Sequence, residues 1–175
     1  MAETGSLTIA WLDDPARARE LARFFADNAD AAYISHSELQ GPRALDVGAW
    51  NPDLVNVVAE EIAERADTAR SFRAPGEPVN PVLVAHSGGR LAGLAFVSFF
   101  REAMNPYVVV EDIIVDSASR GEGLGHGIMA FIDGEARKAG CKRLFLESGL
   151  GNDKAHHFFE RLGFHQTSIV MMKKL

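Results

Sequence analysis

Cysteine is nearly absent from the 175-residue chain, which contains only Cys141. A single cysteine excludes an internal disulfide framework and a zinc site built from several cysteines. We therefore expect no structural metal, and we expect Cys141 to be a small buried side chain.

Long apolar runs are also missing. The longest, at residues 91–100 and 107–110, are shorter than the roughly 20 residues that a membrane helix needs. The first residues show no basic region followed by an apolar core, so we expect no signal peptide and a cytoplasmic protein.

The chain has no excess of basic charge, since its net charge is −6. This charge opposes long-range attraction to nucleic acid or to an anionic membrane, and it favours cationic ligands such as amines. A hydrophobic content of 47% and a charged content of 24% are typical of a globular protein. We predict a single domain over residues 1–175.

The first half of the chain gives few structural signals. Alternation predicts a strand at 7–12, and Asp14 with Pro15 predicts a helix start, followed by a helix to about residue 28. Residues 30–51 lack a period and are predicted to be a long loop with room for one helical turn. Helical spacing returns at 52–69, before a cluster of prolines at 75, 78 and 81.

The second half alternates strands and helices. A hairpin is predicted at 82–100 around Gly88 and Gly89, and a strand at 107–115. A helix to about 139, a parallel strand at 143–146, a helix at 153–162 and a closing strand at 167–173 complete a mixed α/β fold. The residues expected in its core include Leu124, Ile128, Phe131, Ile132, Phe145 and Phe158.

A glycine-rich segment joins the strand at 107–115 to the next helix. Glycines at alternating positions allow close backbone approach to a ligand, and the N–H groups of a helix start then face an anion such as a pyrophosphate. A dinucleotide fingerprint would need glycine where the chain has His126 or Ile128, and the Gly-Lys-Ser/Thr of a Walker loop is absent. Both nucleotide motifs are therefore excluded.

The pattern that does fit is Arg120-x-x-Gly123-x-Gly125, and with it the chain resembles the GCN5-related N-acetyltransferase (GNAT) family. The resemblance continues in the run 111–115 and in the run 152–164, and it covers about residues 82–175. It implies a sheet that is splayed between its fourth and fifth strands, with a cofactor-binding core at 82–175 and acceptor-side helices and a loop at 13–75.

The resemblance also implies that acetyl-CoA is the acyl donor and that no metal takes part. Its pantetheine arm would lie in the splay between the strand at 108–115 and the strand at 143–148. The residues that the resemblance assigns to the cofactor are Ile113, Ile114, Val115, Arg120, Gly121, Glu122, Gly123, Leu124, Gly125, His126, Asn152 and Phe159. Glu122 departs from the family, which often has a basic residue there.

An amine must lose a proton before it can attack a thioester, so a base is needed. Glu111 and Asp112 are the candidate catalytic residues. Adjacent residues of a regular strand face opposite sides, so only one of them would face the substrate, and the sequence leaves open which. Similarity to aminoglycoside-modifying members favours Glu111, and the alternative is a carboxylate that is paired at the strand edge.

Many family members have a tyrosine that protonates the departing thiolate, at the position where this chain has Phe159. Phenylalanine cannot donate that proton. We predict an N-acetyltransferase for a small-molecule primary amine, with Tyr33 and Trp50 shaping the acceptor pocket. The alternatives are acetylation of a protein or peptide amine, and a non-catalytic acyl-CoA sensor. The chain could also form a homodimer.

Overall fold

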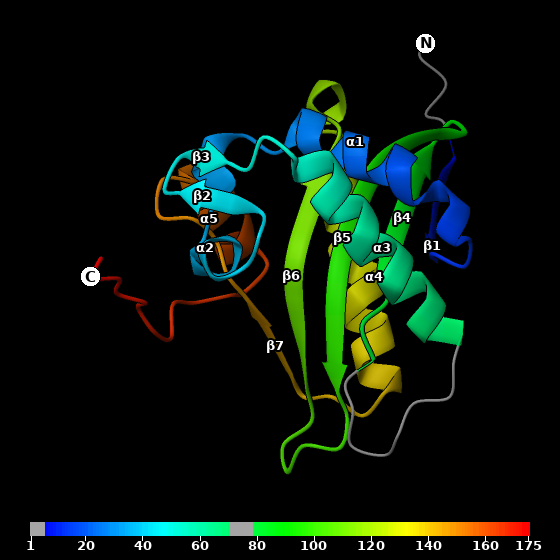
Figure 1. Cartoon of the computed structure of the whole chain (residues 1–175). Helices are drawn as coiled ribbons and strands as arrows, with labels where there is room; N and C mark the ends of the chain where they lie inside the picture. Colours follow the sequence, from blue (N-terminus) through cyan, green and yellow to red (C-terminus); the bar gives the residue numbers. More distant parts are fainter. Residues whose placement is uncertain (1–5, 71–78) are drawn as a thin grey trace. The chain divides into compact units, whose positions relative to one another are not determined.

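The computed structural model of the chain describes residues 6–70 and 79–175 (Figure 1). The chain groups into two compact units, the first formed by Met1–Ala29 with Val55–Glu147 and the second by Asp30–Leu54 with Ser148–Leu175. The helix after residue 54 groups with the sheet, and the end of the chain groups with residues 30–54. The single domain with a cofactor core and an acceptor side stays a prediction. Of the three prolines, Pro75 and Pro78 lie outside the described residues.

The first unit contains a five-stranded mixed sheet in the order β1-β4-β5-β6-β7. The strands are β1 (Leu7–Trp11), β4 (Val82–Ser87), β5 (Arg90–Phe100), β6 (Tyr107–Val115) and β7 (Arg143–Leu146). The first four pair antiparallel, and β7 pairs parallel to β6, as predicted. Gly88 and Gly89, with φ of 56° and 77°, form the tight turn between β4 and β5.

Helices cover both faces of this sheet (Figure 1). They are α1 (Ala18–Asn28), preceded by the 3-10 turn η1 (Pro15–Arg17), α3 (Leu54–Arg70) and α4 (Leu124–Lys138). Phe25 of α1 packs edge-on against Phe96 of β5, with ring centroids 6.1 Å apart. On the other face α4 approaches closely, since a Cβ on Gly93 would lie 2.6 Å from Ile128 Cδ1.

The pairing of β5 with β6 contains a β-bulge. Phe96 opposes Asp112, but the next residue, Val97, opposes Val110, so Glu111 is an extra residue on β6. Opposed residues of an antiparallel pair share a face of the sheet. Asp112 is therefore on the α1 and α3 face with Phe96.

The sheet opens between β6 and β7. The two strands pair only from Tyr107 with Arg143 to Val110 with Leu146. Beyond that point β6 continues through residues 111–115, and no other strand of the described chain pairs with it on that side. The predicted splay between the fourth and fifth strands is confirmed.

The second unit contains more structure than the predicted loop at 30–51. Its elements are the 3-10 turn η2 (Ala31–Tyr33), α2 (His36–Gln40), β2 (Ala44–Asp46), β3 (Ala49–Trp50) and α5 (Asp153–Arg161). A capping box starts α2, in which the Ser35 N–H donates to Glu38 Oε2 at 2.7 Å, and Gly48, with φ of 79°, turns β2 into β3. The single helical turn allowed for in this loop is present as α2, but the prediction missed β2 and β3, because such short elements leave no sustained period in the sequence.

The predicted closing strand at 167–173 is also wrong. After α5, no helix or strand is assigned in the described residues to the end of the chain. Ile169 and Met171 are 80% and 91% exposed. A strand needs a neighbour for its backbone groups, and no described strand pairs with this segment.

The predicted core is confirmed in α4 for Leu124, Ile128 and Ile132, and Cys141 is also buried. Phe131 and Phe158 are only half-buried. Phe145 was wrongly assigned to the core: it lies on the edge strand β7, is 40% exposed and packs edge-on against Tyr107. Among the helices of residues 6–70 and 79–175, none is long and apolar enough to cross a bilayer.

Candidate active site

The glycine-rich segment forms a tight connection between β6 and α4. Asp116 caps the 3-10 turn η3 (Ser117–Ser119) by accepting from the Ala118 N–H, and α4 begins after Gly123. Gly121 and Gly123 have φ of 91° and 84°, the left-handed region that favours glycine. The loop therefore depends on these two glycines.

The start of α4 carries the features of an anion site. Its N-cap is Gly123, and no side chain caps it. The first N–H groups of a helix, here those of Leu124, Gly125 and His126, have no acceptor within the helix, and they lie at the positive end of its dipole. Backbone donors are thus gathered at one point, which is the geometry that binds phosphates.

The side chains of the loop differ in their surroundings. Glu122 and His126 are exposed, whereas Leu124 packs in the core and contributes only its backbone to the loop. Arg120 is exposed, and its Nη2 donates to the backbone carbonyl of Asn28 at 2.9 Å. Arg120 therefore connects the loop to the end of α1.

Asn28 is a residue that the sequence interpretation missed. Its Oδ1 accepts from the Ser117 N–H at 2.8 Å, and its Nδ2 donates to the carbonyl of Phe24 at 2.9 Å. The side chain of Asn28 thus holds the loop after β6, and the backbone carbonyl of Asn28 holds the side chain of Arg120. A polar residue at a helix end is the only local signal of this role, and such residues usually cap the helix.

The open edge of β6 leads directly into the loop. Ile113, Ile114 and Val115 pair with β5 on one side, opposite Ala95, Leu94 and Gly93. On the other side β7 has already ended. The strand edge and the candidate anion site at the start of α4 are joined by the loop at 116–123.

Glu111 and Asp112 do not face opposite sides, because the bulge breaks the regular alternation of the strand. Glu111 bonds to Ser98 of β5 and to Arg65 of α3, and Arg65 lies over Phe96, which opposes Asp112. Both carboxylates are therefore on the α1 and α3 face. They differ in access, since Asp112 is 2% exposed and the side chain of Glu111 is 31% exposed.

The remaining predicted site residues lie in the second unit. Tyr33 and Trp50 are neighbours, with ring centroids 6.3 Å apart and planes tilted by 36°. Asn152 caps α5 by accepting from the Ala155 N–H at 3.4 Å. Phe159 is buried against Phe158 and Phe164, with centroids 5.1 and 5.8 Å away.

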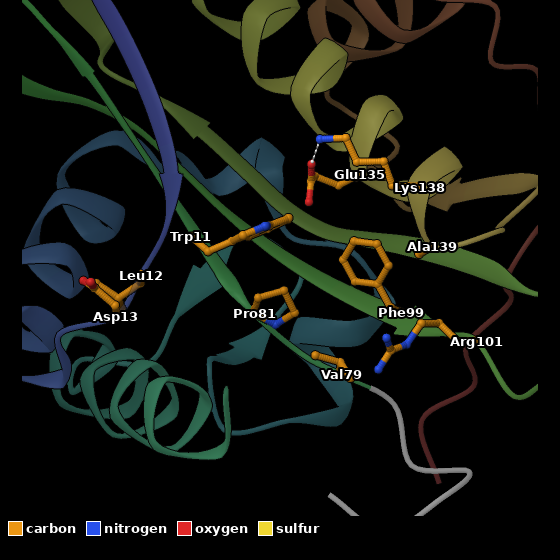
Figure 2. A pocket seen from close by; sticks show the side chains of 10 residues that line it. All are labelled: Trp11, Leu12, Asp13, Val79, Pro81, Phe99, Arg101, Glu135, Lys138 and Ala139. Carbon is orange, nitrogen blue, oxygen red and sulfur yellow. Dashed lines mark hydrogen bonds and ion pairs between the residues drawn. The ribbon is translucent and has the colours of Figure 1, made fainter. Parts of the chain in front are cut away.

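A separate cavity of about 520 Å³ lies in the first unit on the α4 side of the sheet (Figure 2). Trp11 and Phe99 contribute aromatic walls, and Glu135 pairs with Lys138 at 2.7 Å beside them. The lining residues are Trp11, Leu12, Asp13, Val79, Pro81, Phe99, Arg101, Glu135, Lys138 and Ala139. None of the predicted site residues lines this cavity. No group of three or more metal-binding side chains occurs in the part of the chain that the structure describes.

The family model described as the acetyltransferase (GNAT) family matches residues 48–164 of the chain. The chain belongs to the GNAT family. The match includes the β6 edge, the loop at 116–123 and α4, and it ends at Phe164, after α5.

Two curated relatives and one solved structure illustrate the similarity. Streptothricin acetyltransferase from Streptomyces lavendulae is 35% identical over 114 residues, which is 65% of this chain and 54% of the relative, so the chain spans about half of that protein's length. Glucosamine 6-phosphate N-acetyltransferase from Arabidopsis thaliana is 27% identical over 121 residues, 67% of this chain and 78% of the relative. An aminoglycoside N-acetyltransferase solved with CoA shares the fold with a TM-score of 0.65 at 16% identity, covering 100% of this chain and 98% of that one.

Proposed function

We propose that this GNAT protein is an acetyl-CoA-dependent N-acetyltransferase that transfers an acetyl group to a primary amine of a small molecule. The observation that carries the proposal is the continuous run from the open edge of β6, through the loop with Gly121 and Gly123, to the uncapped start of α4. An extended chain can add to a strand edge, and a pyrophosphate suits a helix N-terminus.

The residues present fit acetyl-CoA. The N–H groups of Leu124, Gly125 and His126 would bind the pyrophosphate. Among the described residues, apart from each glycine's own chain neighbours, no atom lies within 4 Å of where Gly121 or Gly123 would carry a Cβ. Residues 113–115 would hold the pantetheine arm along the strand edge. Acetyl-CoA would supply an acyl group that is activated as a thioester.

Glu111 is the base in this proposal. A lysine-like amine has a pKa near ~10.4, so most of it is protonated at neutral pH and cannot attack. The exposed part of the Glu111 carboxylate can take that proton, directly or through a water, whereas Asp112 is almost fully buried. The amine nitrogen then bonds to the acyl carbon as the carbon–sulfur bond breaks, and the second proton that the nitrogen loses on becoming an amide passes to water.

The thiolate leaves without help from residue 159, which is a phenylalanine packed among other phenylalanines. A thiol with a pKa of about 8.5 is an adequate leaving group, and its sulfur can take a proton from water. A non-catalytic acyl-CoA sensor is the second candidate, because Phe159 cannot act as a general acid, and such an acid can raise the reaction rate by ~10²- to 10⁴-fold.

The acceptor that we propose is a small polar amine. The names of the two curated relatives, an acetyltransferase for streptothricin and one for glucosamine 6-phosphate, support this class. The net charge of −6 favours a cationic acceptor, and the adjacent rings of Tyr33 and Trp50 offer a surface for a sugar or another flat group.

The test is to incubate the protein with acetyl-CoA and single amines, and to look for the acetylated product by mass spectrometry. The panel contains aminoglycosides, streptothricin, glucosamine 6-phosphate, polyamines, amino acids and peptides. Acetylation of a small amine supports the proposal. Acetylation of peptides alone would indicate a protein acetyltransferase, and binding of acetyl-CoA without any product would indicate the sensor.

We also propose that the chain forms a homodimer. Ile169, Val170, Met171 and Met172 are exposed in a single chain, and a second copy would cover them. Light scattering would show a dimer that Met171→Asp converts to a monomer. A wild type that is monomeric at micromolar concentration would contradict this assembly. The cytoplasmic location stays a prediction.

A further inference from the structure

Both carboxylate oxygens of Glu111 are held by other parts of the first unit. Oε2 accepts a hydrogen bond from Arg65 Nη2 of α3, and Oε1 accepts one from Ser98 Oγ of β5. Ser98 is only 4% exposed, so its hydroxyl is fixed within the sheet. The bulge at Glu111 makes these contacts possible, because it turns the side chain toward α3.

Arg65 is itself held in place. The same Nη2 lies 2.8 Å from Oε1 of Glu61, one helical turn earlier on α3, and the guanidinium carbon lies 5.1 Å from the centre of the Phe96 ring. The side chain of Arg65 is 12% exposed. A planar guanidinium stacked on an aromatic ring loses little further freedom when it bonds to a carboxylate. Arg65 is therefore a rigid donor.

Glu111 is the more accessible partner of this pair, because its side chain is 31% exposed whereas that of Arg65 is 12% exposed. An ammonium can therefore approach the exposed part of the Glu111 carboxylate. Each carboxylate oxygen has two acceptor sites, so an oxygen bonded to Arg65 or Ser98 can still accept from an amine.

We propose that Arg65 is a positioning residue for the amine-activating carboxylate of Glu111, with Glu61 and Ser98 completing its support. This inference rests on the proposed function, in which Glu111 takes the proton of the acceptor. A glutamate side chain has three rotatable bonds, and a base must be aimed to within a fraction of an ångström. A misplacement of ~1 Å can cost about 10²-fold in rate.

The experiment compares kcat and KM of the wild type, Arg65→Gln, Arg65→Lys and Glu111→Gln for an amine that the wild type acetylates. Arg65→Gln should lower kcat by about 10- to 100-fold, with a change below about threefold in the KM for acetyl-CoA. Arg65→Lys should recover part of the loss, since it keeps the charge but not the planar fork. Arg101→Gln is the matched control. Arg101 also lies beside a phenylalanine of β5, Phe99, but it lines the cavity on the other face of the sheet (Figure 2). This substitution should leave kcat unchanged.

The double variant Arg65→Gln/Glu111→Gln separates positioning from a purely structural role. If Arg65 acts through Glu111, the double variant is no slower than Glu111→Gln alone. Additive losses, or an unchanged kcat in Arg65→Gln, would overturn the proposal.

A crystal structure of Arg65→Gln decides the same point without any activity measurement. We expect the Glu111 carboxylate to leave its place beside Ser98 or to occupy several conformations. A carboxylate in the same single position would overturn the role of Arg65. A wild type that acetylates no amine would contradict the proposed function instead.

Discussion

The guanidinium of Arg120 donates a hydrogen bond to the backbone carbonyl of Asn28 at 2.9 Å, and so links the loop before α4 to the last residue of α1. The side-chain oxygen of the same Asn28 accepts from the Ser117 N–H. Asn28 thus accepts two hydrogen bonds, one from each end of the segment 117–120. The shape of the proposed anion site thus depends on a residue that is nearly 90 positions earlier in the chain.

We expect Asn28→Ala to weaken CoA binding, because the Ser117 N–H loses its acceptor and the loop becomes less ordered. One hydrogen bond of about 0.5–1.5 kcal/mol corresponds to a rise of about 2- to 12-fold in Kd. Isothermal titration calorimetry with CoA measures the change. The control is Asn56→Ala. Asn56 lies on α3 and accepts an exposed hydrogen bond from Arg19 of α1, so its loss should leave the Kd for CoA unchanged. A Kd for Asn28→Ala equal to that of the wild type would show that Asn28 does not support the loop.

Gly123→Ala should weaken both folding and CoA binding. Its φ of 84° costs an L-residue about 1–2 kcal/mol, and relief of that strain would turn the first N–H groups of α4 away from their common point. Urea denaturation and CoA titration would measure the two effects.

The control for this glycine is Gly134→Ala in the middle of the same helix, where an added Cβ meets nothing within 4 Å. That change should stabilise the protein by about 0.5–1 kcal/mol without altering CoA affinity. If Gly123→Ala matched this control in both measurements, the left-handed N-cap would contribute neither to stability nor to CoA binding.

Much of the first unit could be predicted because its signals are local. Asp14 before Pro15, the glycine pair at 88 and 89, and Gly140, with φ of 76° after α4, each mark a boundary within a few residues. The loop at 120–125 was found for the same reason. Its glycines lie at alternating positions of one short segment, and two of them, Gly121 and Gly123, have positive φ.

The surroundings of Glu111 could not be predicted in full, because they depend on pairing between strands. The sequence of β6 is apolar except for Glu111 and Asp112, and nothing in it shows that β5 skips Glu111 in its pairing. Arg65 looks like any charged residue on a helix, with its partner Glu61 one turn away. The closing strand was predicted wrongly for a related reason, since β propensity at 167–173 does not provide a neighbouring strand.

Cys141 should react slowly with thiol reagents. Burial raises the pKa of its thiol, and the positive charge of Arg101 offsets this only in part. A raised pKa leaves less of the reactive thiolate at pH 8, so labelling by a disulfide reagent should be about tenfold slower in the folded protein than in urea. Equal rates in the two conditions would contradict the burial of this side chain. Slow labelling also means that Cys141 would not disturb an assay of CoA release.

The most direct test of the account is amine-dependent release of CoA thiol by the wild type and by Glu111→Gln, with Glu60→Gln, an exposed glutamate of α3, as the control. We expect Glu111→Gln to lower kcat by about 10²- to 10⁴-fold, because an amide cannot take the proton of the amine, while the Kd for CoA stays within about threefold. Glu60→Gln should keep the wild-type kcat. Full activity in Glu111→Gln would contradict the account, because the amine would then lose its proton to another group.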